Sequence, residues 1–294
     1  MQAALGKWFA RADTSAIRGD LAQFSAGADL ATLDALGDLL GCHDTAKNFV
    51  QAFAVHFVAS LRDAPLGEAP FQHRSSEGFL RLQLMREGRA LLSLCTYDRV
   101  SDPAEPDHAR FADYEAHEIV IAGEARCMCH RLGESGELTT HRTDLSAGER
   151  IVRRPRQDAR QIVAVERSLS VLQLTRTRPR PAPTCEHRLS DGKLVQRSSG
   201  DRQASEDVMA LGVLGALGDG RSVPQMREVA LDAFRDRDVR WEAVRQVIAM
   251  DARAGIALLT ELGPPDPLAV PAEALRDQLC ASHPTLRELI MGNV

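Results

Sequence analysis

The sequence predicts an α+β protein in which an all-β middle section lies between two helical sections. Three observations indicate this. Apolar residues recur at helical spacing over residues 1–64, they alternate with a period of two from about residue 71 to 198, and helical spacing returns after Gly200. We therefore expect an N-terminal helical segment at 1–70, a β-sandwich at 71–200 and an α-helical domain at 201–294.

The N-terminal section contains two apolar stripes at helical spacing. The first is made of four leucines: Leu30, Leu33, Leu36 and Leu40. Gly41 follows it as a stop signal, and Asp44-Thr45 can cap the next helix. In that helix Phe49, Phe53 and Phe57 fall four residues apart, which is typical of a face buried in a core. The segment 65–70, with two prolines and a glycine, is predicted to end the helices.

The middle section has the pattern of short antiparallel strands. Leu80 to Leu84 alternate with polar residues, Glu87-Gly88 supplies a turn, and the alternation resumes from Ala90, which together predict a hairpin. Further strands are expected at His117–Ala122, Ala125–Leu132, Leu138–Thr143, Glu149–Arg154, Arg160–Glu166 and Ser168–Thr175. Turns are expected at Gly123-Glu124 and, in a last hairpin, at Asp191-Gly192. Because no helices interrupt these strands, a sandwich or barrel is favoured over a parallel sheet.

The C-terminal section carries a weak internal repeat. Val239 and the segment 242–245 recur as Val270 and the segment 273–276, an offset of 31 residues. Segment 236–262 resembles a HEAT-type repeat. This resemblance implies a short stack of helix pairs that share one core and offer a face to a protein partner.

Composition excludes several classes of protein. The chain has 294 residues, 44% of them hydrophobic and 26% charged, and a net charge of -5, which is typical of a soluble globular protein. No stretch approaches the ~18–20 apolar residues that a membrane span needs. Segment 1–19 lacks the apolar core of a secretory signal, so we expect a cytoplasmic protein without membrane association.

Six cysteines are spread along the chain, and without an export signal they are expected to be reduced thiols. Only Cys127 and Cys129 lie close together. Residues two apart on a strand share a face, so both thiols could line one surface. No second cluster with ligand spacing accompanies them, and small buried hydrophobes are favoured over a metal or redox site.

Only three of the 36 basic residues are lysines, so an arginine carries less functional weight here than usual. Nine arginines nevertheless fall between Arg150 and Arg180. Such a strip is typical of an anion site or of outward-facing strand positions that protect sheet edges, and the second interpretation is favoured. Nucleic acid is not expected as a partner, because aromatic residues that would stack on bases are scarce.

Residues 75–198 resemble a cupin, a double-sheet jelly roll whose interior often holds a metal. In the first cupin motif, His108 takes the first histidine position, Arg110 the second, Glu115 the glutamate and Gly123 the final glycine. In the second motif, which fits loosely from Gly148, the histidine position holds Arg160. The helices ahead of the jelly roll and the proline-rich segment after it are similar to the cysteine dioxygenase-like branch, whose members oxidise small thiols at a three-histidine ferrous site.

The two arginines at ligand positions change what the resemblance implies. A guanidinium stays protonated, gives no lone pair to a cation and repels it. We therefore expect no metal cofactor, and we expect Arg110 and Arg160 to contact an anionic ligand in the cavity, with Glu115 as an ion-pair partner. The function expected is a non-catalytic binding, regulatory or scaffold protein for a small anionic molecule or a protein partner.

The alternative is a metal-dependent cupin oxygenase that acts on a small thiol or acid with iron or another divalent metal. Its candidate ligands are His108, Glu115, His117 and His141. Glu118 and His130 are further substitutes. His117 and Glu118 are neighbours on a strand and point to opposite faces, so both cannot bind one metal. Whether the chain is an enzyme stays open at this point, as does a homodimer formed through sheet edges.

Overall fold

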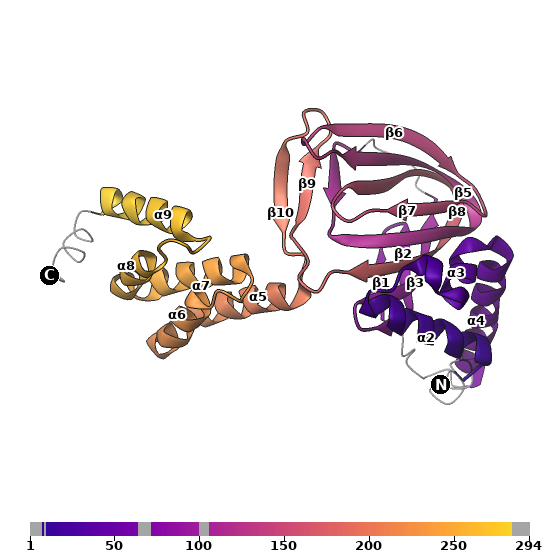
Figure 1. The fold of residues 1–294 in the computed structure, drawn as a ribbon, viewed down its shortest axis with the longest axis horizontal. Helices are drawn as coiled ribbons and strands as arrows, with labels where there is room; N and C mark the ends of the chain where they lie inside the picture. The colour runs from indigo at the N-terminus through magenta and orange to yellow at the C-terminus, as the bar shows by residue number, and fades with distance from the viewer. Residues whose placement is uncertain (1–7, 9, 64–71, 100–105, 284–294) are drawn as a thin grey trace. The chain divides into compact units, whose positions relative to one another are not determined.

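The fold is described from a computed structural model, for residue 8 and residues 10–63, 72–99 and 106–283. The chain divides into two compact units, Met1–Gly200 and Asp201–Val294. The first unit contains the N-terminal helices and all of the strands, and the second is helical (Figure 1). The expected break at 65–70 lies outside the residues that the structure describes.

The N-terminal helices form one layer against the sheet. They are α2 (Ala12–Ala26), the 3-10 turn η1 (Leu30–Thr32), α3 (Asp34–Gly41) and α4 (His43–Asp63). The leucine stripe is divided between η1 and α3. The Asp29 side chain accepts a hydrogen bond from the Ala31 N–H, which fixes the start of the short turn ahead of Leu33. The expected stop at Gly41 is confirmed.

A seven-stranded antiparallel sheet is the larger of the two sheets in the first unit. Its order is β1-β2-β3-β8-β5-β6, and β7 also pairs with β5. The strands are β1 (His73–Ser76), β2 (Phe79–Glu87), β3 (Ala90–Asp98), β5 (Tyr114–Leu132), β6 (Leu138–Leu145), β7 (Arg150–Arg153) and β8 (Asp158–Thr177). The hairpin of β2 and β3 is the predicted one, with its turn one residue later than expected, since Glu87 pairs with Ala90.

A second, three-stranded sheet has the order β10-β9-β4. Its strands are β4 (His108–Phe111), β9 (Thr184–Arg188) and β10 (Leu194–Ser198). It packs on the large sheet through Ala109, Phe111 and Ala159. Within the described part of the chain, β1 and β6 end the large sheet and do not pair with each other, so the strands form two sheets and no closed barrel.

Two pairs of expected strands are single long strands in the structure. Segments 117–122 and 125–132 both belong to β5, and segments 160–166 and 168–175 both belong to β8. The expected turn at Gly123 was wrong: Gly123 lies inside β5, opposite Leu169, between two register shifts. It has φ +89°, and a Cβ there would lie 1.9 Å from the Ser168 carbonyl oxygen. The glycine therefore marks a bend between two strands and not a reversal of the chain.

The two faces of the large sheet bury different cores. One face packs against the N-terminal helices through residues such as Leu92, Leu172 and Leu174 together with Phe49 and Phe53, as the phenylalanine stripe predicts. The opposite face buries a second cluster that includes Cys127, Val165 and Val171. Because side chains alternate along a strand, neighbours on β5 belong to different faces.

The second unit consists of α5 (Arg202–Leu217), the 3-10 turn η2 (Gly220–Ser222), α6 (Val223–Leu231), α7 (Arg237–Met250), α8 (Ala252–Glu261) and α9 (Ala269–Ser282). These helices share one apolar core. A buried guanidinium crosses it: Arg240 donates from Nε to the Ala230 carbonyl oxygen at 2.8 Å and from Nη2 to Asp266 at 2.5 Å. The matched repeat positions differ in burial, since Val239 is 1% exposed and Val270 is 78% exposed.

Candidate functional site

A buried cluster of charges lies on the face of the large sheet that is turned away from the helices. At its centre is Glu118 on β5, whose side chain is fully buried. Its Oε1 accepts hydrogen bonds from Arg153 Nη2 at 2.6 Å and from Gln173 Nε2 at 2.5 Å. Its Oε2 lies 2.6 Å from Arg160 Nη2 in an ion pair.

Strand register explains two of these contacts. Glu118 is opposite Ile151 of β7 on one side and Gln173 of β8 on the other. Arg153 lies two residues after Ile151 and therefore projects from the same face. The third contact needs the bend of the sheet, because the register places Arg160 opposite Cys129, eleven residues along β5 from Glu118.

The cluster has more donors than acceptors. Two guanidiniums face one carboxylate, which leaves a net charge of +1 in a buried region. Three nitrogen atoms of these guanidiniums are buried and have no hydrogen-bond partner in the part of the chain that the structure describes: Arg153 Nε, Arg160 Nε and Arg160 Nη1. One acceptor, Glu118 Oε2, also has no hydrogen bond there and meets Arg160 only as an ion pair. Buried donors are almost always paired, so these atoms indicate a place for an acceptor.

All three groups are charged at neutral pH. Burial alone would raise the pKa of Glu118, but the charges of Arg153 and Arg160 outweigh it and lower that pKa to about 2. Burial lowers the pKa of Arg153, whereas the Glu118 carboxylate raises it further, so the net shift is upward. The same two effects raise the pKa of Arg160. These three groups therefore carry a fixed net charge of +1.

A cavity of about 240 Å³ lies beside the cluster. Arg153 and Arg160 line it together with Cys129, His141 and other residues of β5, β6, β7 and β8. Cys129 pairs with His141 on β6 and with Arg160 on β8, so these three side chains form a row across neighbouring strands. The volume is below the ~300–1,000 Å³ of a drug-sized pocket, which suits a ligand of a few heavy atoms.

Two thiols lie at the same place. The Sγ atoms of Cys127 and Cys129 are 3.9 Å apart. The hydrogen bond from Cys127, aided by His141 and Arg160, lowers the pKa of Cys129 to about 6 although burial opposes this shift. The same hydrogen bond raises the pKa of Cys127, and burial adds to that rise.

The residues expected to bind an anion lie in three separate places. Arg160 is in the buried cluster, with its side chain 4% exposed. Arg110 is on β4 of the small sheet, where its side chain is 64% exposed and its Nε lies 3.8 Å from Glu186 Oε2. Glu115 is on the helix-facing side of β5, so it is not the partner of Arg110 or Arg160.

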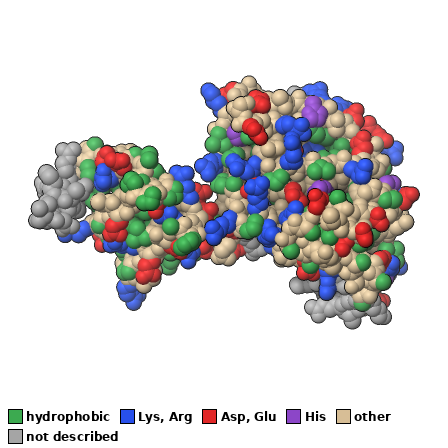
Figure 2. Space-filling model, viewed as in Figure 1, with side chains coloured by type: hydrophobic (Ala, Val, Ile, Leu, Met, Phe, Trp, Pro, Cys, Tyr) green, Lys and Arg blue, Asp and Glu red, His purple; other side chains and the backbone are tan. Residues whose placement is uncertain are grey.

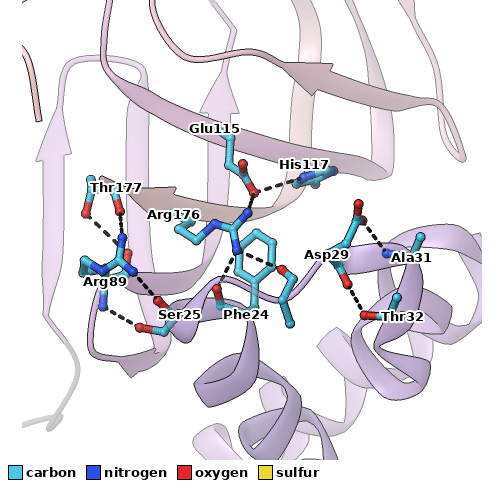
Figure 3. Close-up of polar contacts among 11 residues, drawn as sticks. Phe24, Ser25, Asp29, Ala31, Thr32, Arg89, Glu115, His117, Arg176 and Thr177 are labelled. Carbon is cyan, nitrogen blue, oxygen red and sulfur yellow. Dashed lines mark hydrogen bonds and ion pairs between the residues drawn. The ribbon is translucent and has the colours of Figure 1, made fainter. Parts of the chain in front are cut away.

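Glu115 belongs to a set of contacts that join α2 to the sheet (Figure 3). Its Oε1 lies 2.8 Å from Arg176 Nη2 and 3.7 Å from His117 Nε2. Arg176 Nη1 donates to the carbonyl oxygens of Phe24 and Ala28, and its guanidinium lies 4.1 Å from the centre of the Phe24 ring. Glu115 is therefore engaged in holding helix and sheet together.

A second arginine, Arg89, also links the C-terminal end of α2 to the sheet. Arg89 Nη2 donates to the Ser25 carbonyl oxygen at 2.7 Å, and Arg89 Nη1 donates to the Thr177 carbonyl oxygen at 2.9 Å. The Arg89 backbone N–H donates to Ser25 Oγ at 2.9 Å (Figure 3). The last carbonyl groups of a helix have no partner within it, so these arginines satisfy the end of α2.

The candidate metal ligands do not form a metal site. His108 Nδ1 lies 2.7 Å from Asp107 Oδ1 on the small sheet, Glu115 and His117 face the helices, and His141 lines the cavity. His117 and Glu118 point to opposite faces of β5, as their spacing requires. Within the described ranges, no three His, Cys, Asp or Glu side chains are placed to hold one metal ion. These residues do not fit a cupin metal centre.

Motif spacing missed most of the cluster. Arg153 and Gln173 were not among the candidates, and Glu118 was considered only as a substitute metal ligand. The available signal was alternation: Glu118 occupies an inward position between Ala116 and Val120, where a carboxylate must find a cationic partner.

The arginine-rich segment 150–180 does not form one surface. Arg153 and Arg160 are buried with Glu118, Arg176 reaches α2, and Arg154 pairs with Asp158 at 3.0 Å. On the face seen in Figure 2, Lys and Arg side chains lie among acidic and apolar ones. Across the residues that the structure covers, no helix is both long enough and apolar enough to span a bilayer.

Comparisons with known proteins give similarity to solved structures alone. No family model matches the chain, and no curated protein matches it. A 7S globulin of Momordica charantia is 14% identical over 40% of this chain, with a TM-score of 0.30, and the match spans 35% of the globulin. An RmlC-like cupin from Shewanella frigidimarina is 11% identical and matches 37% of this chain and 86% of its own, with a TM-score of 0.27.

A cupin 2 conserved barrel domain protein from Rhodopseudomonas palustris is 18% identical, matches 40% of this chain and 70% of its own, and has a TM-score of 0.26. The chain thus has cupin-type neighbours over about two fifths of its length. This low similarity assigns no ligand or activity to the chain.

Proposed function

We propose that this chain binds a small anion in the cavity beside Arg153 and Arg160 and acts as a binding or regulatory protein without metal chemistry. The observation that supports the proposal is the excess of buried positive charge over negative charge, with guanidinium nitrogen atoms that have no partner in the described chain. An anion would supply both the missing charge and the missing acceptors.

The unpaired donors of Arg153 and Arg160 cost the folded protein free energy when no anion is bound. Leaving a buried donor unpaired costs about 1–3 kcal/mol, and more when the group is charged. An oxoanion or carboxylate accepts charge-assisted hydrogen bonds from a guanidinium, which are roughly twice as strong as neutral ones. Binding therefore relieves a cost that the folded protein already carries.

The cavity sets the class of ligand. About 240 Å³ corresponds to the share of liquid volume of roughly eight water molecules, at ~30 Å³ each. An inorganic oxoanion or a short carboxylate fits such a space. His141 on the cavity wall gives a further nitrogen for hydrogen bonding on the β6 side.

The proposal includes the two fold assignments. Two antiparallel sheets that pack together, with a buried polar cluster on the larger one, support a cupin-like unit in residues 71–200. Consecutive helices with a common core support a HEAT-like stack in residues 201–294. A cupin-like unit with arginine at a ligand position suits the binding of an anion better than the binding of a cation.

The test is calorimetric titration of the full chain with orthophosphate, sulfate and acetate in chloride-free HEPES buffer. We expect at least one of these anions to bind, and we expect Arg160→Gln to weaken that binding about tenfold or more, since one charge-assisted hydrogen bond is worth ~1.5–3 kcal/mol. Arg110→Gln, an exposed arginine of the small sheet, is the matched control and should leave affinity unchanged.

Arg160→Gln leaves Glu118 with one cationic partner fewer and could lower stability. The double variant E118Q/R160Q removes both charges and is compared with Glu118→Gln, relative to which it should show the same tenfold loss of affinity. The proposal fails if none of the three anions binds the native chain, or if removing Arg160 leaves affinity unchanged both in the native chain and in the Glu118→Gln protein.

A further inference from the structure

We infer that Cys127 and Cys129 form a thiol–disulfide pair that a hydroperoxide oxidises at the cavity between β5, β6, β7 and β8. The inference rests on the cavity and its side chains and does not require an anion to be bound there. It differs from the sequence-based expectation that these thiols are small buried hydrophobes.

Geometry favours a pair with two different roles. Both side chains project from one face of β5, and their sulfur atoms are 3.9 Å apart. Cys129 is half-buried and lines the cavity, whereas Cys127 is fully buried behind it. A small oxidant that enters the cavity therefore meets Cys129 first, and Cys127 is the nearest thiol to what forms there.

The neighbours of Cys129 suit a reactive sulfur. Arg160 on β8 and His141 on β6 lie directly across from it on the two adjacent strands. Arg160 also has Nε and Nη1 without a hydrogen-bond partner in the described chain. Such donors can stabilise the thiolate before reaction and the negative charge that develops on the departing oxygen.

The groups around Cys129 shift its pKa in opposite directions. Cys127 on the same strand, His141 and Arg160 lower the pKa of Cys129, and burial and the Glu118 carboxylate raise it. The net effect is a pKa of about 6, so most of the thiol is ionised at neutral pH. Cys127 stays protonated because its pKa is raised.

The chemistry balances with a hydroperoxide as the only oxidant. The Cys129 thiolate attacks one oxygen, the O–O bond breaks, and the second oxygen leaves as an alcohol, or as water from hydrogen peroxide, after taking up a proton. Cys129 is then a sulfenic acid. The sulfur of Cys127 attacks it, an S–S bond forms, the S–O bond breaks, and water leaves with the Cys127 proton. Two electrons pass from the two thiols to the O–O bond.

The bond requires a local change of the strand. A rise of ~3.3 Å per residue separates the α-carbons of residues two apart by about 6.6 Å, at the upper end of the ~4.4–6.8 Å seen for disulfides. Side chains on one face are nearly parallel, so their β-carbons are about as far apart and must approach to ~3.5–4.5 Å. The register shift of β8 beside Cys127 leaves room for a local adjustment. A bond at this limit should be reduced readily by dithiothreitol.

Two other cysteines, Cys95 and Cys42, differ from Cys129 in burial and in location. Cys95 is buried, and burial raises its pKa to about 11, so its thiol is protonated and inaccessible. Cys42 is exposed, and hydrogen bonds from Thr45 and Asp44 at the start of α4 lower its pKa, but it lies outside the cavity. Cys42 can therefore react with peroxide, yet it has no cavity neighbour with which to form the proposed bond.

Tryptic peptide mapping can test for the Cys127–Cys129 bond, because two arginines flank the pair. Trypsin cleaves after Arg126 and Arg131, so residues 127–131 form one peptide that contains both thiols. The full chain, in phosphate-free buffer, is treated with stoichiometric hydrogen peroxide, alkylated and digested. We expect this peptide to become lighter by two hydrogen atoms and to resist alkylation, and dithiothreitol should reverse both changes. Oxidation of Met128 adds an oxygen atom and is distinguished by mass.

Three variants identify the roles. Cys127→Ser should leave a sulfenic acid on Cys129 that dimedone labels. Arg160→Gln should slow oxidation about tenfold, the effect of one lost charge-assisted contact. Cys42→Ser should form the bond at the native rate. The inference is wrong if the 127–131 peptide stays fully alkylatable while Cys42 is oxidised, or if Cys127→Ser traps no sulfenic acid at Cys129.

The Cys129 thiolate is itself an anion beside Arg160. Anion binding is therefore measured on full-length Cys129→Ser protein and thiol oxidation in phosphate-free buffer, so each result stands by itself. Should Arg160→Gln fail to fold, the peptide assay on the native chain and on Cys127→Ser decides the question.

Discussion

Arg160 Nη2 lies 2.6 Å from Glu118 Oε2, although the strand register places Arg160 opposite Cys129 at the other end of β5. Such a contact between positions distant in the ladder requires the sheet to curve, so that the start of β8 approaches the first part of β5. The curvature depends on Gly123 and the register shifts around it. The buried charges thus depend on a backbone feature that lies outside the cluster.

Replacing Glu118 with glutamine should raise anion affinity. The variant keeps the shape and the amide contact with Gln173 but changes the buried net charge from +1 to +2. We expect the dissociation constant for the bound oxoanion to fall about tenfold, a change of ~1.4 kcal/mol, in calorimetric titration. An unchanged or weaker affinity in a folded Glu118→Gln protein would show that the cluster does not hold the anion.

Acid should destabilise the protein through Glu118. Its folded pKa of about 2 lies below the ordinary value of 4.5, so its ionised form contributes stability above pH 4.5 that is lost as pH falls toward 2. A shift of this size corresponds to about 3 kcal/mol. Urea unfolding from pH 6 to pH 2 should show a shallower pH dependence for Glu118→Gln than for the native chain, and equal slopes would contradict this role.

Removing Arg176 should loosen α2 from the sheet. Arg176→Ala deletes one hydrogen bond to a carbonyl group of α2 and one to the Ala28 carbonyl group just after it, together with the ion pair with Glu115 and the contact with the Phe24 ring. We expect a loss of about 2–4 kcal/mol in the free energy of unfolding. Arg18→Ala is the control, because Arg18 also joins α2 to the sheet, through Glu87, but its side chain is 59% exposed. Its cost should be within ~1 kcal/mol in urea unfolding.

Alanine substitutions at Gly123 and Gly136 distinguish the cost of backbone strain from the cost of a steric clash. Both have φ +89°, so alanine at either position adopts an unfavourable backbone conformation, at a cost of ~1–2 kcal/mol. A Cβ at Gly136 meets nothing within 4 Å, whereas one at Gly123 meets the backbone of Ser168. Gly123→Ala should therefore cost at least ~2 kcal/mol more than Gly136→Ala in thermal or urea unfolding. Equal costs would mean that β5 and β8 separate freely at the bend.

The helical unit should depend on Arg240. Arg240→Ala leaves the Ala230 carbonyl oxygen and Asp266 without their partner, and breaking a buried pair in this way costs about 3–5 kcal/mol. Arg245→Ala, on the same helix, removes an exposed pair with Glu242 and should cost less than ~1 kcal/mol. Urea unfolding of the full chain in a Trp8→Phe background, where Trp241 is the remaining tryptophan, would measure both by fluorescence, and similar costs would argue against the buried pair.

The local patterns in the sequence predicted much of the fold. Period-two alternation located the hairpin of β2 and β3, and the phenylalanine stripe located the buried face of α4, because both patterns follow from the geometry of a single element. The joining of segments 117–122 and 125–132 into β5 was not predicted, since a glycine inside a strand and a glycine in a turn look alike in sequence.

The candidate site was predicted less completely. Arg160 was expected in the interior and lies there, whereas Arg110, from the same reasoning, lies exposed on the small sheet. Motif spacing fixes a position along the chain but not the sheet or face to which it belongs. Arg153 contacts Glu118 because β7 pairs with β5. The residues around Arg153 in the sequence do not predict which strand β7 pairs with.

The shared core of α2, α3, α4 and the large sheet has a consequence for anyone who dissects this protein. Leu92, Leu172 and Leu174 are fully covered by those helices. A fragment trimmed to start at the first strand would present that leucine-rich surface to water and would aggregate. The minimal soluble piece that carries the cavity must therefore retain the helices and also Trp8, which is buried in the same core ahead of α2.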